Sequence, residues 1–266
     1  MKLAIWSSYF ADLTPEDMVR QLASAGWRYS ELSDEHSRML LARGAPDAAG
    51  RTFAAFASEH GVTFTQGHLD LPCDIAPADE SARRRAVQGL SPWFDLYCAM
   101  GIRAGVLHPG GATLEPDRRH AQRMRSVTEI GAYLAGTGLI VCIENCSSGA
   151  ELAPLMAATD PARFGVCLDT GHLNLTTEPQ AAFIEQMGPR LKALHLAENG
   201  GKTDEHVLPF ARGGTVPWAD VAAALRRVGY DGLLNFEIPG ETRCPLPVRR
   251  LKLGYLKALA SHIFAV

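Results

Sequence analysis

Residues 164–172 read FGVCLDTGH, an apolar run that ends in a short polar segment. A continuous apolar run of this length is typical of a strand that is buried on both faces of a parallel sheet. Seven similar runs occur elsewhere in the chain: KLAIWSS from Lys2, YSELS from Tyr29, TFTQGHL from Thr63, AGVLHPG from Ala104, LIVCIEN from Leu139, LKALHLAE from Leu191 and LLNFEIP from Leu233. The sequence therefore predicts eight strands.

Helical patterns separate these runs. Thr14 and the following Pro15-Glu16-Asp17 have the features of an N-cap, a proline in the first turn and an acidic first turn. Residues 217–229 repeat this design, and successive strands begin 25 to 42 residues apart, which leaves room for one helix and two loops. Eight such units predict an α/β fold, a (β/α)8 TIM barrel, with residues 1–266 as a single domain.

Composition excludes several classes of protein. Hydrophobic residues make up 47% of the chain and charged residues 21%, so a large core is expected rather than disorder. The net charge of −3 gives no reason to expect a nucleic-acid partner or an anionic membrane surface. Basic runs at 83–85 and 118–119 fall in helical patterns, where we expect them to lie on a solvated outer face.

Cysteine usage and the N-terminus both favour a cytoplasmic location. The six cysteines include no C-x-x-C pair, so neither a disulfide framework nor a structural zinc site is indicated. The segment MKLAIWSSYF is too short and too polar for a signal peptide, and no apolar run is long enough for a membrane span.

Polar residues gather where the predicted strands end, which is where TIM barrels carry their chemistry. Glu144, Asp169 and Glu237 follow apolar strands, where unpaired charges would cost several kcal/mol and would repel one another. A divalent cation between them removes both problems. The oxygen-rich set favours Mn²⁺, with Zn²⁺, Mg²⁺ or Co²⁺ as alternatives. Histidines and one further carboxylate share these loops: His68, His108, His172, His195, Asp204 and His206.

Several of these segments resemble the xylose-isomerase-like TIM-barrel superfamily, which holds sugar isomerases and epimerases and the endonuclease IV type of apurinic nuclease. The matching pieces are VLHPGG, VCIEN, VCLDTGHLNL, ALHLAENGGKTDEH, GGTVPW and NFEIPG, and they extend over roughly three quarters of the chain. Their order and spacing are typical of the superfamily, but they do not single out one member.

The resemblance implies two sets of site residues. By likeness to the epimerases, the metal ligands are Glu144, Asp169, His195 and Glu237, with Glu144 and Glu237 also the catalytic acid and base. By likeness to the nucleases, a metal cluster also includes His68, His108, His172, Asp204 and His206, all of which are present. These five are therefore candidates for additional metal binding or substrate binding, and His172 matches a residue that contacts a substrate oxygen in the epimerases.

The sequence also departs from both branches. The segment that follows the seventh strand carries only Lys202 and Arg212 as basic residues, whereas a nuclease needs loops that grip phosphates. Epimerases place an arginine shortly after the seventh-strand histidine, and only Arg212 is available for that substrate-binding role here.

Taken together, these features predict a metal-dependent enzyme that isomerises or epimerises a small ketose, or a related keto-sugar or polyol, through an enediolate. The alternatives are a metal-dependent dehydratase or lyase acting on an oxidised sugar, an endonuclease IV type phosphodiesterase acting on abasic DNA, and a sugar-binding barrel without catalysis. The expected partner is a small sugar, with neither nucleic acid nor membrane, and a homo-oligomer is compatible with the sequence.

Two residues near the predicted mouth have alternative interpretations. Trp6 could form, together with Phe10, an apolar wall for a sugar ring, or it could cap the barrel core. Glu31 at the end of the second strand could bind a substrate hydroxyl or form a surface ion pair.

Overall fold

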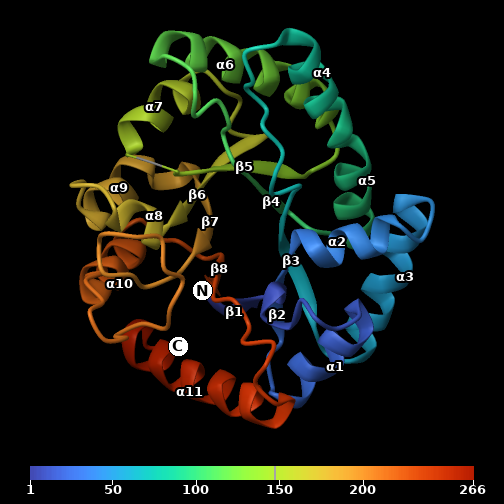
Figure 1. Cartoon of the computed structure of the whole chain (residues 1–266), viewed down its shortest axis with the longest axis vertical. Coiled ribbons are helices and arrows are strands. Elements are labelled where there is room, and N and C mark those ends of the chain that lie inside the picture. The colour runs from blue at the N-terminus through green and yellow to red at the C-terminus, as the bar shows by residue number, and fades with distance from the viewer. Residues whose placement is uncertain (147) are drawn as a thin grey trace.

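The computed structural model describes residues 1–146 and 148–266, and a parallel sheet of eight strands forms its centre (Figure 1). The strand order is β7-β6-β5-β4-β3-β2-β1-β8, and a parallel bridge between Leu196 and Phe236 joins the two outer strands into a barrel. The strands are β1 (Lys2–Trp6), β2 (Tyr29–Leu32), β3 (Thr63–His68), β4 (Ala104–Leu107), β5 (Ile140–Glu144), β6 (Phe164–Asp169), β7 (Leu191–His195) and β8 (Leu233–Phe236). The predicted TIM barrel and its eight strands are confirmed, whereas the single-domain organisation stays a prediction.

Helices surround this barrel (Figure 1). They are α1 (Pro15–Ser24), α2 (Asp34–Leu41), α3 (Pro46–Glu59), α4 (Glu80–Gly89), α5 (Ser91–Met100), α6 (Pro116–Tyr133), α7 (Gly149–Ala157), α8 (Thr170–Asn174), α9 (Gln180–Met187), α10 (Trp218–Arg227) and α11 (Leu246–Phe264), with 3-10 turns η1 (Ser7–Phe10) and η2 (Gly188–Arg190). Helix α1 begins as predicted, because the Thr14 side chain accepts a hydrogen bond from the Asp17 backbone amide.

The core lies mainly between the strands and the surrounding helices. Alternate strand residues such as Val141 and Ile143 pack outward against the helices, in one large cluster of buried side chains. Phe10 is fully buried in this cluster, so it does not form the apolar wall that the sequence suggested. In the described part of the chain, no helix combines the length and the apolar character needed to cross a bilayer. All six cysteines are free thiols.

The basic run at residues 83–85 does not lie entirely on the solvated outer face of its helix, where we expected it. Arg84 and Arg85 are exposed on α4, but Arg83 is only 1% exposed. Its guanidinium donates to Ser126 Oγ at 3.1 Å and forms ion pairs with Glu80 and Glu129. The outer-face prediction is wrong for Arg83, because α4 packs against α6 and the helix period turns one arginine of the three toward that neighbour.

We expect Arg83→Ala to lower the free energy of unfolding by about 2 kcal/mol, since it removes a buried hydrogen bond and the packing of the long aliphatic stem. Arg85→Ala, on the exposed face of the same helix, should change that free energy by less than about 0.5 kcal/mol. Chemical denaturation of both variants measures the difference. Equal losses would show that the buried contacts of Arg83 contribute nothing beyond those of an exposed arginine.

Candidate metal centre

Side-chain alternation along the strands brings the polar residues together at one end of the barrel. Cys142 and Ala193 belong to a cluster of small buried side chains that β4 to β7 share. Glu144 and His195 lie two residues further along the same strands, and residues two apart in a strand point to the same face. The carboxyl ends of the parallel strands therefore direct these side chains into the barrel.

Four of these residues form the central group. Glu144, Asp169, His195 and Glu237 are all at most 5% exposed, and each offers one ligand atom within 4.8 Å of the others. Glu144 Oε2, Asp169 Oδ2, His195 Nδ1 and Glu237 Oε2 are buried without a hydrogen-bond partner among the described residues. Buried polar atoms are normally paired, and three carboxylates with one imidazole are a donor set that suits a divalent cation. The residues present therefore fit the predicted metal.

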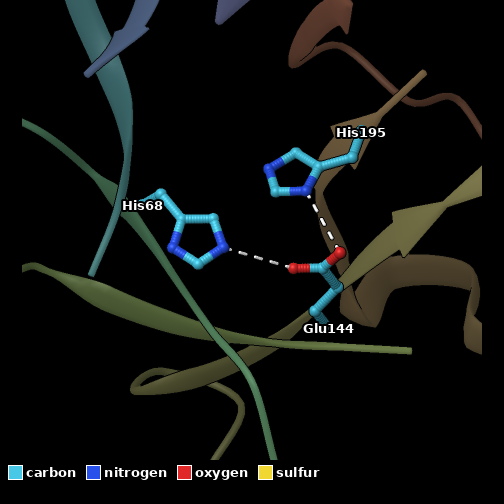
Figure 2. Close-up of side chains that lie close together, drawn as sticks. All are labelled: His68, Glu144 and His195. Atoms are coloured by element: carbon cyan, nitrogen blue, oxygen red, sulfur yellow. Dashed lines mark ion pairs between the residues drawn. The ribbon is translucent and has the colours of Figure 1, made fainter. Parts of the chain in front are cut away.

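Two further groups flank the central one. Glu144 lies between two imidazoles in Figure 2, with Oε2 at 3.5 Å from His68 Nε2 and Oε1 at 3.2 Å from His195 Nδ1. These three residues also satisfy the spacing of a metal site. His108 Nε2 is 3.3 Å from the same Oε2 of Glu144. With His172 Nδ1 at 3.3 Å from Oε1, this carboxylate faces four histidines, and it could bridge two cations.

On the other side, Asp169, His172 and His206 form the third group. Asp204 joins it from the loop after β7, with one oxygen 3.2 Å from His172 Nε2 and the other 3.3 Å from His206 Nε2. This loop folds back on β7 through an antiparallel bridge between Glu198 and Val207. His206 is thereby held against β8, where Nδ1 donates to the Glu237 carbonyl oxygen at 2.9 Å.

Charge coupling governs the protonation of these groups. Burial raises the pKa of Asp169 to about 7. Burial acts in the same direction on Glu237, but the positive charge of His195, 3.3 Å away, lowers the Glu237 pKa to about 2. Burial lowers the pKa of His68, whereas the close negative charge of Glu144 outweighs it and raises that pKa to about 9. Histidine protons therefore neutralise the carboxylates, and a metal that took their place would release protons.

The site opens into a cavity of about 420 Å³. It is lined by Trp6, Leu71, His108, Glu144, His172, Asp204, His206, Glu237 and Pro239. Trp6, Leu71 and Pro239 give this cavity an apolar wall, and the remaining lining residues are carboxylates and histidines. No lysine or arginine occurs among the lining residues that the structure describes. Trp6 thus lies where the sequence suggested an apolar wall.

Two other predicted substrate contacts lie elsewhere. Arg212 is exposed and is not one of the residues that line the cavity. Glu31 is completely buried and its Oε1 is 3.0 Å from His195 Nε2, so the surface ion pair suggested for it is wrong. The reason is that β2 directs Glu31 into the barrel interior, where it meets a residue of β7.

Asn145 is a positioning residue to which the sequence analysis assigned no role. Its Oδ1 accepts from the Asp169 backbone amide at 2.7 Å, and its Nδ2 donates to the Asp169 carbonyl at 3.0 Å. These two bonds align the end of β6 with the end of β5. The sequence signal for this role was its position: Asn145 directly follows Glu144 at the polar end of the apolar run LIVCI.

Comparison with known proteins points to one family. The model of the xylose isomerase-like TIM barrel family matches residues 19–259. The uncharacterized protein y4fM of Sinorhizobium fredii is 39% identical over 169 residues, which cover 59% of this chain and 54% of that protein. A probable endonuclease 4 of Nitratidesulfovibrio vulgaris is 33% identical over 137 residues, or 47% of this chain and 46% of that protein.

A D-psicose 3-epimerase of Enterocloster bolteae is 26% identical over 198 residues, which cover 68% of this chain and 64% of the epimerase. The chain thus spans about half to two thirds of the length of these curated relatives. A crystal structure of a D-psicose 3-epimerase in the presence of D-fructose covers 100% of both chains with a TM-score of 0.83 at 17% identity. This likeness demonstrates a shared fold.

Metal removal should lower thermal stability, because an ion that binds only the folded protein adds RT ln(1 + [M]/Kd) to the free energy of unfolding. At a Mn²⁺ concentration 100 times Kd this is about 2.7 kcal/mol, or roughly 5–10 °C in Tm. Differential scanning calorimetry with Mn²⁺ and with excess chelator measures the shift. Glu237→Gln should lose most of it, whereas Glu205→Gln, an exposed carboxylate in the loop after β7, should retain it. An unchanged Tm after verified metal removal would contradict a site built from these strand ends.

Proposed function

The chain belongs to the xylose isomerase-like TIM barrel family, and we propose that it is a divalent-metal-dependent isomerase or epimerase of a small ketose or a related keto-sugar or polyol. The observation that carries this proposal is the convergence of Glu144, Asp169, His195 and Glu237 below a cavity of sugar size. Relatives named as a D-psicose 3-epimerase and an L-ribulose 3-epimerase support the same class of substrate.

Glu144 and Glu237 are proposed to transfer the protons. They enter the cavity from the end of β5 and from just beyond β8, and both line it. One carboxylate removes the proton from the carbon next to the substrate carbonyl, which forms an enediolate, and the other returns a proton to the opposite face. A divalent cation held by the central four residues would supply the polarisation of the carbonyl and the adjacent hydroxyl.

Two histidines are placed to maintain the proton supply. His172 Nδ1 is 3.3 Å from Glu144 Oε1, and His206 Nδ1 is 3.3 Å from Glu237 Oε2. The pKa of His206 rises to about 9 because Asp204 and Glu237 outweigh the effect of burial. Each glutamate therefore has a histidine neighbour through which it can exchange a proton between turnovers.

The cavity walls favour a neutral sugar. Trp6, Leu71 and Pro239 can pack against the C–H face of a sugar. The described lining residues include no lysine or arginine that could pair with a phosphate or carboxylate. A dehydratase or lyase would use the same base and differ only in the group that leaves the substrate.

A second candidate is an endonuclease IV type phosphodiesterase. His68 and His108 on one side and Asp204 with His206 on the other exceed what a single cation needs, and phosphodiesterases use two or more metals to clamp the attacking and leaving oxygens. The similarity to probable endonuclease 4 also supports it. The lack of lysine and arginine among the described lining residues and the net charge of −3 favour the sugar.

Glu144→Gln and Glu237→Gln should each reduce turnover by a factor of 10² to 10⁴, because each removes a proton-transfer group. Because both residues are also proposed ligands, metal content is measured beside the rate, and the rate is compared at full occupancy. Glu205→Gln is the matched control and should keep its activity. Retention of more than about a tenth of the wild-type rate by both variants would exclude the assigned acid and base.

The same protein should exchange solvent deuterium into the carbon next to the carbonyl of a small ketose, and it should not bind abasic-site duplex at physiological salt. Mass spectrometry of a panel of ketoses and a fluorescence binding assay test the two expectations. Exchange without isomerised product would favour the lyase or dehydratase. Nanomolar binding and incision of abasic DNA would replace the proposed function with the nuclease.

A further inference from the structure

We propose that Glu31 is a positioning residue of the metal centre. In this role Glu31 holds the His195 ring so that Nδ1, rather than Nε2, faces the three carboxylates. The inference rests on the metal centre of the proposed function but not on the identity of its substrate. It assigns Glu31 a role beneath the site instead of a contact with a substrate hydroxyl.

The two hydrogen-bond contacts of the Glu31 carboxylate determine which nitrogen of His195 carries a proton. Its Oε1 lies 3.0 Å from His195 Nε2, and its Oε2 accepts a hydrogen bond from Asn235 Nδ2. Both carboxyl oxygens thus face nitrogen donors, and an ionised carboxyl group offers acceptors alone. His195 Nε2 must therefore carry a proton when it faces Glu31.

The opposite ring nitrogen is left for the metal. His195 Nδ1 has no hydrogen-bond partner within the described residues, and it lies 3.2 Å from Glu144 Oε1 and 3.3 Å from Glu237 Oε2. A neutral imidazole carries one proton, so fixing it on Nε2 leaves the lone pair on Nδ1. Carboxylates that accept from the distal nitrogen of a metal-binding histidine commonly fix its tautomer and raise its basicity.

The position of Glu31 excludes a direct role with substrate. Glu31 and His195 are both completely buried, and Glu31 is not among the residues that line the cavity. It belongs to β2, whereas His195 ends β7, so the contact spans the barrel interior between strands that are not neighbours. A carboxylate here costs several kcal/mol in desolvation unless it is fully paired. Within YSEL, it is the one charged residue of its strand.

The test must separate positioning from a merely structural hydrogen bond. Glu31→Gln keeps the size and removes the charge, and Asn235 can accept from the new amide because its Oδ1 has no partner in the described structure. Ser30→Ala is the matched control. Ser30 is the neighbouring buried residue of β2, and its hydroxyl donates to the Ile5 carbonyl at 2.7 Å without touching His195.

The dissociation constants of Zn²⁺ and Mn²⁺ are measured by competition with a chromophoric chelator. Glu31→Gln should bind both ions 10- to 100-fold more weakly, because the neutral amide no longer raises the basicity of His195 and can present either its oxygen or its nitrogen to Nε2, so that it does not fix the tautomer. Ser30→Ala should bind them as the wild type does, although both variants lose some thermal stability. Binding by Glu31→Gln within twofold of the wild type would overturn the inference.

A second measurement needs no variant that might misfold. In the Zn²⁺-loaded wild type labelled with ¹⁵N-histidine, the long-range proton–nitrogen spectrum should show His195 protonated at Nε2 and coordinated through Nδ1. Coordination through Nε2 would contradict the proposal. A wild type that binds neither ion would overturn the proposed function together with this inference. Metal binding with the expected tautomer but no ketose exchange would refute the proposed function alone.

Discussion

Three carboxylates, Glu144, Asp169 and Glu237, converge inside the barrel where water cannot screen their charges. Their mutual repulsion is the constraint on the site, and the surrounding histidines reduce it by pairing with the carboxylates. Histidines face Glu144 and Glu237 at 3.2–3.5 Å, His172 lies 3.9 Å from Asp169, and Asn145 holds the ends of β5 and β6 in register. Protons on the histidines balance this charge, and the same residues fit a divalent cation that would replace those protons.

The barrel tolerates this concentration of charge because its stability comes from elsewhere. The layer between strands and helices is a continuous cluster of buried aliphatic and aromatic side chains, and it makes no use of the polar residues at the barrel mouth. Parallel strands also satisfy their own backbone groups. The strand ends are therefore free to carry residues that burial alone would disfavour, which is how TIM barrels separate folding from chemistry.

The number of histidines distinguishes this centre from a minimal four-ligand site. Glu144 meets four imidazoles, those of His68, His108, His172 and His195, and Asp204 meets that of His172 and one more, that of His206. With one cation bound, the remaining histidines can act as proton donors around it. With several cations bound, the same histidines would be ligands instead. The side chains that line the cavity help to distinguish a sugar site from a phosphodiester site. Here the described lining includes tryptophan, leucine and proline but no lysine or arginine.

The sequence by itself determined the strands and the polar residues at their ends. The reason is that side chains two positions apart in a strand, such as Cys142 and Glu144, point to the same face, and this depends only on the local chain. It also pointed to the metal, since carboxylates after apolar strands need a counter-charge. Only the tertiary structure decided which residues meet across the fold. Glu31 and His195 are 164 positions apart, Arg83 is buried by α6, and Phe10 enters the core. Such contacts depend on how whole elements pack, and no local pattern along the chain encodes them.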